Sequence, residues 1–193
     1  NLQNIPARHD EWNVRQAFVP REGYKFLMAD YSQIELRMLA HFSKDEHMTK
    51  TFIEGGDIHA TTMELTGITE RRIAKNVNFG IVYGVGPRTL SAMINKSEAE
   101  SKKYIDSFLN GYPQVRQFIH RVQQMTFATG TVEMITGRKR HFHEYQDRRW
   151  YGTIARQAVN TKIQGSAADL IKIAMIKLRP ELEKIGAFQL VQI

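Results

Sequence analysis

The sequence has no cysteine among its 193 residues. This absence excludes disulfide bonds, thiolate-ligated zinc sites and cysteine nucleophiles. Long apolar runs are also missing. None approaches the roughly 18 residues that a membrane-spanning helix needs, and the mean hydropathy is −0.42. The first six residues lack the basic and apolar regions of a signal peptide. We therefore expect a cytoplasmic protein with no secretion signal and no membrane partner.

Acidic residues are outnumbered by basic ones. The chain has 27 Lys and Arg against 20 Asp and Glu, which gives a net charge of +7 and a pI of about 9.7. Seven basic and two acidic residues fall within 138–162, so this segment alone carries a net charge of +5. Such a balance suits an anionic partner. The segment is either an ordinary solvated surface or a phosphate-facing strip, and its composition does not decide between the two.

The apolar periodicity predicts an α+β fold that is mostly helical. Residues 24–30 are typical of a buried strand that ends at Asp30, and another apolar strand is expected at 189–193. A short hairpin, with strands at 131–135 and 139–143, is expected around a Thr-Gly-Arg turn. The remaining apolar stripes predict helices over about 33–42, 58–65, 69–83, 98–111, 115–129, 150–164 and 167–185.

Several residues mark the expected ends of these helices. Ser97 and Glu100 have the spacing of a capping box, in which each side chain bonds the other residue's backbone N–H. Thr69 is expected to cap the helix that follows it. Gly165 separates the last two predicted helices, and Pro180 is expected to kink the second of them or end it early.

Asp30 and Glu35 place one carboxylate at the end of the predicted strand and a second one turn into the next helix. A carboxylate at a strand end can bind a hard divalent cation such as magnesium. Spacing alone, however, favours a simpler interpretation, because an aspartate at this position is more often a helix cap or a turn residue.

Four side chains recur at every fourth position and therefore share one face of a predicted helix: Arg71, Lys75, Phe79 and Tyr83. Two cations followed by two aromatic rings suit a ligand with a polyphosphate at one end and a flat ring system at the other. A core aromatic pair with a solvated basic end fits the same spacing, and spacing alone favours it. Glycines beside the two rings shift the balance toward a ligand, because glycine is expected where something approaches the backbone closely.

A second polar stripe consists of Arg156, Asn160 and Gln164 and overlaps the basic segment. A cation and two amides suit contacts with phosphates and base edges. An ordinary solvated helix face explains the stripe equally well. His141 and His143 are assigned to a surface hairpin rather than to a metal site, because no third ligand is in view.

Five blocks of the sequence, in the same order, resemble the DNA polymerase I family (family A polymerases). Residues 30–37, Asp-Tyr-Ser-Gln-Ile-Glu-Leu-Arg, are similar to its motif A. Residues 71–84, Arg-Arg-Ile-Ala-Lys-Asn-Val-Asn-Phe-Gly-Ile-Val-Tyr-Gly, are similar to its motif B, the O helix. The other three blocks lie at 1–6, 55–59 and 164–169.

The resemblance implies a DNA-directed DNA polymerase, a nucleotidyltransferase of DNA replication in a bacterium or a phage-infected cell. Its partners would be primer–template DNA and dNTPs, and its cofactor would be two Mg²⁺ ions. The protein would be a monomer. A single-subunit phage-type RNA polymerase shares the Lys…Tyr-Gly helix, but Glu35 argues against it if that residue excludes a ribose 2′-hydroxyl. A basic nucleic-acid-binding module that descends from a polymerase stays open as the non-enzyme alternative.

The resemblance also implies a role for each matching residue around the metal ions and the sugar. Asp30 would hold both magnesium ions, with the Tyr31 carbonyl as an additional ligand. Glu35 would be the steric gate against the 2′-hydroxyl.

Further roles are implied for the incoming nucleotide. His59, Arg71 and Lys75 would hold its triphosphate, and Lys75 would also donate a proton to the leaving pyrophosphate. Phe79 would stack on the base and sugar, and Tyr83 would lie at the template side of the nascent pair. The primer–template duplex would be contacted by Gln3, Asn4, Arg156, Asn160 and Gln164.

The implied architecture is part of a polymerase right hand. A palm segment with motif A would span 1–42, mobile fingers with motif B 43–150, and a second palm segment 151–193. Both ends of the chain are abrupt, which indicates an internal fragment of a longer protein. The family's second metal-binding carboxylate follows a strand like 190–193, and the chain ends before it. We therefore expect the parent protein to polymerise and the 193-residue chain alone to be inactive.

Overall fold

The structure is a computed structural model that describes residues 14–188. The predicted DNA contacts of Gln3 and Asn4 and the predicted strand at 189–193 lie outside the described residues.

The chain divides into two compact units. The larger is Gln33–Lys172, and the smaller combines Asn1–Ser32 with Ile173–Ile193. The predicted palm and fingers boundaries at residues 42 and 150 stay a prediction.

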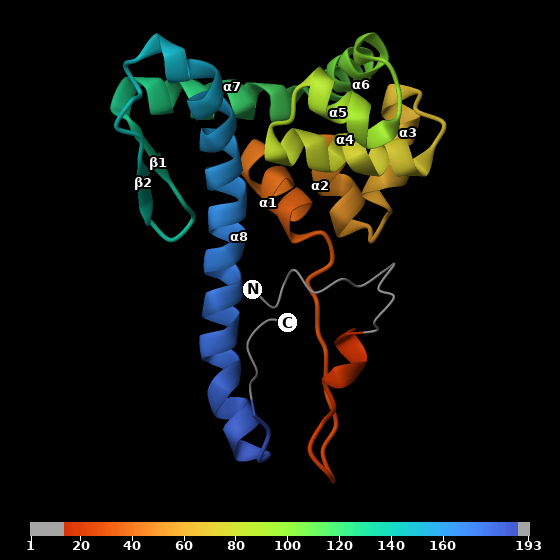
Figure 1. The fold of residues 1–193 in the computed structure, drawn as a ribbon, viewed down its shortest axis with the longest axis vertical. Helices are drawn as coiled ribbons and strands as arrows, with labels where there is room; N and C mark the ends of the chain where they lie inside the picture. Colours follow the sequence, from red (N-terminus) through yellow and green to blue (C-terminus); the bar gives the residue numbers. More distant parts are fainter. Residues whose placement is uncertain (1–13, 189–193) are drawn as a thin grey trace. The chain divides into compact units, whose positions relative to one another are not determined.

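Helices make up most of the described chain, with one short hairpin, so the predicted α+β, mostly helical class is confirmed (Figure 1). The hairpin strands β1 (Thr131–Glu133) and β2 (Lys139–His141) are antiparallel, and Val132 pairs with Arg140. None of the helices in the described ranges is long and apolar enough to cross a membrane. The elements are 3₁₀ turns at Val14–Ala17 and Arg148–Trp150, α1 (Ile34–Ser43), α2 (Glu46–Ile53), α3 (Ile58–Thr66), α4 (Arg71–Tyr83), α5 (Pro87–Ile94), α6 (Glu98–Gly111), α7 (Pro113–Thr129), β1 (Thr131–Glu133), β2 (Lys139–His141) and α8 (Tyr151–Lys184).

Helix α4 occupies the centre of the larger unit. It packs against α1, α3, α5 and α6 (Figure 1). Its apolar stripe, which includes Ile73, Val77 and Ile81, is buried in the main hydrophobic core. Burying one such side chain stabilises the fold by roughly 1.5–3 kcal/mol. The rotation of α4 about its own axis is therefore fixed, and so is the direction of its remaining face.

Side-chain and glycine signals define the ends of several helices as expected. The capping box at the start of α6 is present, with the Glu100 amide 3.2 Å from Ser97 Oγ and the Ser97 amide 3.0 Å from Glu100 Oε2. Gly130 ends α7 with a φ of 68°, in the left-handed region that glycine adopts without strain. The prediction that Thr69 caps α4 is wrong, because Glu70 occupies the N-cap position and makes no side-chain cap bond.

The predicted strand at 24–30 is wrong for the structure described here. These residues form no strand and are exposed, with Leu27 92% and Met28 90% accessible. A β-strand requires hydrogen bonds to a neighbouring strand. The smaller unit offers no such strand among residues 14–32 and 173–188. The predicted burial of these residues is wrong as well. Strand pairing depends on a partner that local sequence does not supply.

The two predicted C-terminal helices are one continuous helix, α8, and Gly165 does not interrupt it. A Cβ at Gly165 would lie 2.8 Å from Met134 Cγ, so the glycine allows the hairpin to approach the helix closely. Pro180 lies inside α8 without ending it. Two further helices, α2 and α5, lie in stretches for which no helix was predicted.

A buried carboxylate joins the hairpin to α8. The Asp169 side chain is 7% exposed and forms an ion pair with Arg138 at 2.8 Å. The Thr136 hydroxyl donates to the same carboxylate at 2.6 Å. The hydrogen bonds from Arg138 and then Thr136 lower the pKa of Asp169. The carboxylate therefore stabilises the fold while it is ionised.

Replacing the Asp169 carboxylate tests whether its bonds to Arg138 and Thr136, here called the clamp, stabilise the fold. Asp169→Asn should lower the free energy of unfolding by about 1.5–3 kcal/mol, the usual contribution of hydrogen bonds to a charged group. The matched control Asp106→Asn removes an exposed i,i+4 partner of Lys102 and should cost less than about 1 kcal/mol. Urea unfolding of both variants measures the difference.

The stability that Asp169 contributes should also depend on pH. Because the folded pKa of Asp169 lies below its unfolded value, the contribution is complete above the unfolded pKa and is lost as the pH falls through the folded one. Equal stabilities of the two variants at neutral pH would contradict the clamp.

Candidate functional site

The polar face of α4 forms the centre of the candidate site. Arg71 is the first residue of the helix, and Tyr83 is the last. Arg71, Lys75 and Tyr83 are exposed and Phe79 is half-buried, whereas the opposite stripe lies in the core. The four-residue spacing therefore brings these side chains to one accessible face, as the sequence predicted.

Arg71 is held in place by a carboxylate at the start of α3. Asp57 Oδ2 accepts hydrogen bonds from Arg71 Nε at 2.9 Å and Nη2 at 2.7 Å. Asp57 Oδ1 accepts the His59 backbone N–H at 2.9 Å and so caps α3. Burial alone would raise the pKa of Asp57, but the bonds from Arg71 and the His59 amide outweigh it and lower the pKa. The guanidinium thus lies at the N-terminus of α4 with Nη1 outside this ion pair.

His59 lies deeper than its predicted role suggested, because its residue is only 3% exposed. Its Nδ1 is 2.7 Å from Asn78 Nδ2 on α4. The ring centroid lies 6.1 Å from that of Phe79. Burial lowers the pKa of His59; Asp57 opposes this shift, whereas Arg71 and Lys75 add to it. Burial and the two cations of α4 thus favour the neutral form of the imidazole.

The two aromatic rings of α4 stack on each other, with centroids 6.3 Å apart and planes 20° apart. Burial and the nearby Glu35 charge raise the pKa of Tyr83, and a hydrogen bond with Gln164 opposes the shift. Residues of α1 and α8 thus act on Tyr83 of α4, although Glu35 and Gln164 lie far apart in sequence.

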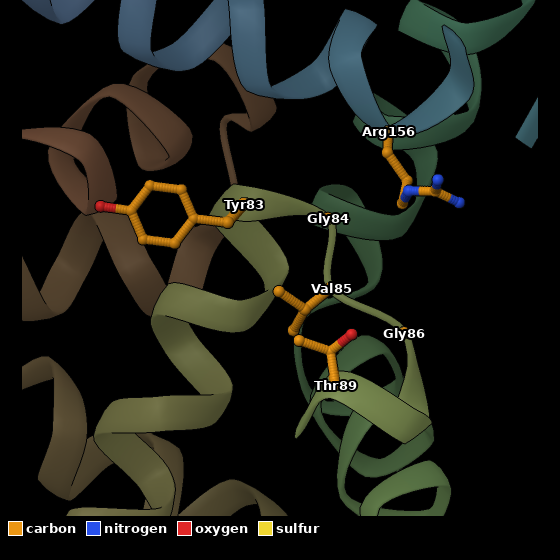
Figure 2. A pocket seen from close by; sticks show the side chains of 6 residues that line it. All are labelled: Tyr83, Gly84, Val85, Gly86, Thr89 and Arg156. Carbon is orange, nitrogen blue, oxygen red and sulfur yellow. The ribbon is translucent and has the colours of Figure 1, made fainter. Parts of the chain in front are cut away.

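A cavity of about 390 Å³ opens beside the C-terminal end of α4. Figure 2 shows Arg156 from α8 on one side of Gly84 and the Tyr83 ring directed to the other side. Gly84 has a φ of 66°, and a Cβ there would lie 3.2 Å from Arg156 Cβ. The cavity is lined by Tyr83, Gly84, Val85, Gly86, Thr89 and Arg156.

Gly80 and Gly84, the two glycines that suggested a ligand, are approached by side chains of this chain instead. At Gly80 a Cβ would lie 2.8 Å from Val85 Cγ2, and at Gly84 it would meet Arg156. The close approach that requires glycine is made by this chain's own side chains. The glycines therefore shape the turn after α4, and the argument for a ligand rests on the polar face alone.

The basic segment 138–162 is largely engaged within the chain. Arg138 pairs with Asp169, Arg140 donates to Thr161 and Gln157, and Lys162 donates to the Glu133 carbonyl. On α8, Arg156 is exposed while Asn160 and Gln164 are half-buried. The stripe thus presents one exposed cation, next to the cavity at Gly84.

Asp30 and Tyr31 lie in the smaller unit and are exposed. Among residues 14–188, no group of three or more His, Cys, Asp or Glu side chains could hold a metal ion. His141 is the last residue of β2, and His143 follows two residues later.

Comparison with known proteins identifies the family. The whole chain, residues 1–193, matches the family model described as DNA polymerase family A. The chain belongs to this family. It is 45% identical over 191 residues to DNA polymerase I of Streptococcus pneumoniae, which covers 92% of this chain and 22% of that protein. It is 42% identical over 204 residues to the thermostable DNA polymerase I of Thermus filiformis, which covers 100% of this chain and 24% of that protein.

A solved family A structure has the same fold. The polymerase domain of Pol1 from M. smegmatis, in complex with DNA primer–template and dNTP, superposes with a TM-score of 0.86 at 34% identity. The match covers 96% of this chain and 35% of that one. The chain spans about a quarter or less of the curated relatives' length, 22% and 24% in these two examples.

Sequence reasoning missed several residues that organise the site. Asp57, which orients Arg71, stands two residues before His59, in the position of a helix N-cap, and that signal could have found it. Asn78 stands next to Phe79 within motif B, but its partner His59 lies on another helix. Thr62 and Tyr112, which complete the network around Asn78, carry no local signal.

The turn after α4 provides a stability test. Gly84→Ala should destabilise the protein by about 1–2 kcal/mol, the cost of a left-handed conformation for a residue with a Cβ, with crowding at Arg156 added. Gly152→Ala, in the first turn of α8 with only an ordinary 3.6 Å neighbour, should instead be neutral or stabilising. Thermal unfolding compares the two. A stable Gly84→Ala variant would show that the turn after α4 is not constrained in this way.

Proposed function

We propose that this chain carries the nucleotide-binding face of a template-directed DNA polymerase and adds dNTPs to a primer 3′-hydroxyl. One observation carries the proposal. The accessible face of α4 presents Arg71 and Lys75 first and the stacked rings of Phe79 and Tyr83 after them. A dNTP has the same order, a triphosphate followed by a sugar and a base. The M. smegmatis relative, described in complex with primer–template and dNTP, supports this assignment.

The triphosphate binds at the N-terminal end of α4. The helix dipole and the free backbone N–H groups favour an anion there. Arg71 keeps Nη1 available while Asp57 accepts hydrogen bonds from its Nε and Nη2. Lys75 lies one turn further on and is exposed. It neutralises charge on the phosphates and is the proton donor to the leaving pyrophosphate.

The sugar and base lie over the aromatic end of the same face. Phe79 stacks on the nucleotide, and Tyr83 lies at the template side of the nascent pair. The Glu35 charge acts on the pKa of Tyr83, which supports a position for Glu35 on the same side of α4. We propose that its carboxylate occupies the space that a ribose 2′-hydroxyl would need.

The primer–template duplex binds beside α8. Arg156 lines the cavity at Gly84 and contacts a phosphate, while Asn160 and Gln164 are proposed to face base edges. Gln3 and Asn4 complete these contacts in the proposal. The proposal also keeps the division of the chain into palm segments at 1–42 and 151–193 and fingers at 43–150.

The metal ions of such a reaction stabilise the attacking and leaving oxygens. Magnesium in these sites takes one or two carboxylates and completes its shell with water and substrate phosphates. The exposed Asp30 carboxylate and the Tyr31 carbonyl fit part of such a shell. They would hold the Mg²⁺ ions together with ligands from outside residues 14–188. The inactivity of the isolated 193-residue chain stays a prediction.

Removing one cation of α4 tests the proposed function. In the full-length protein, Lys75→Ala should lower kcat/KM for dNTP incorporation by about tenfold or more, because a hydrogen bond to a charged group contributes roughly 1.5–3 kcal/mol. The matched control Lys102→Ala removes an exposed lysine of α6 and should leave incorporation unchanged. Single-nucleotide primer extension measures both. Wild-type-like extension by the Lys75 variant would contradict the placement of the triphosphate.

Shortening the carboxylate beside Tyr83 tests the choice of sugar. Glu35→Ala should raise incorporation of ribonucleotides relative to deoxyribonucleotides, because it opens space for the 2′-hydroxyl. Competition between the two nucleotides on one primer–template measures the ratio. An unchanged ratio would refute the gate and favour the RNA polymerase alternative.

A further inference from the structure

Asp57 bonds two different partners with its two carboxylate oxygens. Oδ1 accepts the backbone N–H of His59 at 2.9 Å and caps α3. Oδ2 accepts from Nε of Arg71 at 2.9 Å and from Nη2 at 2.7 Å. Because the cap fixes Oδ1 relative to the helix backbone, it also fixes the direction of Oδ2. The start of α3 thus sets the orientation of Asp57, and Asp57 in turn sets the position of the Arg71 guanidinium.

The ion pair leaves one edge of the guanidinium accessible. A guanidinium presents donors along two edges that suit bidentate contacts, Nε with Nη2 and Nη1 with Nη2. Asp57 occupies the first edge through a single oxygen. Within residues 14–188, no acceptor lies along the second edge. Such an edge matches two oxygens of a phosphate group.

This ion pair contributes little to the stability of the fold. Water and salt screen exposed ion pairs, and the side chains of Arg71 and Asp57 are 58% and 38% exposed. The packing of α3 against α4 already buries Ile58 and Ile73 in one hydrophobic core. The main effect of the two short hydrogen bonds is therefore to restrict the Arg71 side chain.

We propose that Asp57 is a positioning residue for dNTP binding: it holds the Arg71 guanidinium so that the edge formed by Nη1 and Nη2 is presented to the triphosphate. The inference rests on the proposed function, because it needs a triphosphate at the N-terminal end of α4. It assigns a role in binding an anion to a residue that is itself acidic.

Asp57 affects an anionic ligand in two opposite ways. The carboxylate is ionised at neutral pH, because burial raises its pKa less than the bonds from Arg71 and the His59 amide lower it. Its charge therefore repels a triphosphate, but water and salt screen this repulsion at an exposed position. Its hydrogen bonds restrict a long side chain before the ligand binds, which reduces the ordering cost of binding. We expect the second effect to be the larger one.

The substitution Asp57→Asn separates the two roles of the carboxylate. The amide oxygen can still cap α3, because asparagine is among the preferred N-cap residues. The amide nitrogen in the place of Oδ2 is a donor and cannot accept from the guanidinium. The variant therefore keeps the start of α3, releases Arg71 and removes one negative charge.

A double-mutant cycle with Arg71→Ala measures how Asp57 acts on dNTP binding. The dissociation constant of the dNTP that matches the template is measured in the full-length polymerase by single-turnover incorporation. With Arg71 present, Asp57→Asn should weaken dNTP binding about three- to tenfold, the cost of ordering one long side chain. In the Arg71→Ala background the same substitution should leave the dissociation constant unchanged or lower it, because only the loss of charge remains.

The cycle can overturn the proposal in two ways. Equal weakening in both backgrounds would show that Asp57 acts on the fold and not through Arg71. Unchanged or tighter binding by Asp57→Asn with Arg71 present would show that charge repulsion outweighs positioning. The matched control Asp106→Asn removes an exposed carboxylate that pairs with Lys102, and it should leave dNTP binding unchanged.

A second variant, Asp57→Ser, covers the case in which Asp57→Asn does not fold. Serine also caps helices, but it offers no carboxylate to the guanidinium. It should weaken dNTP binding when Arg71 is present and not when Arg71 is replaced by alanine. The same effect in both backgrounds would overturn the proposal.

The single variant Arg71→Ala distinguishes this inference from the proposed function. If Arg71→Ala does not weaken dNTP binding, the triphosphate does not bind at this end of α4, and both proposals fail. If Arg71→Ala weakens binding and Asp57→Asn has the same effect in both backgrounds, the proposed function stands and the positioning role of Asp57 is refuted.

Discussion

Burial of one face of α4 is the constraint on which the rest of the site depends. Ile73, Val77 and Ile81 insert into a core built by α1, α3, α5 and α6, and this packing fixes the rotation of the helix. Side chains four residues apart share a face of a helix. The four side chains at positions 71, 75, 79 and 83 are therefore directed away from that core. No polar residue of the site has to supply this orientation.

Polar interactions fix the positions of individual side chains on the face that the apolar core has oriented. Asp57 caps α3 and holds the Arg71 guanidinium through two hydrogen bonds. The buried network from Tyr112 through Asn78 fixes His59 in the same way. Both arrangements hold a side chain in place at the basic end of α4, the Arg71 guanidinium in one case and the His59 ring in the other. Such preorganisation reduces the ordering cost of binding.

How much the sequence predicted depended on whether the determining interaction was local. The α6 capping box lies within four residues, and its geometry was predicted correctly. The strand at 24–30 and the break at Gly165 were not, because the first needs a pairing partner and the second is explained by contact with Met134. The same limit applies to the site. The face of α4 follows from its four-residue spacing, whereas the link from Asn78 to His59 spans two helices and carries no local pattern.

Hydrogen–deuterium exchange of the full-length protein tests the central claim most directly. We propose that the incoming nucleotide binds on the polar face of α4. Adding the dNTP that matches the template should therefore slow amide exchange in residues 71–83, while a mismatched dNTP should have a much smaller effect. Residues 98–111, which form α6 in the same unit, serve as the internal reference and should change little. Slowed exchange elsewhere with no change in α4 would contradict the account.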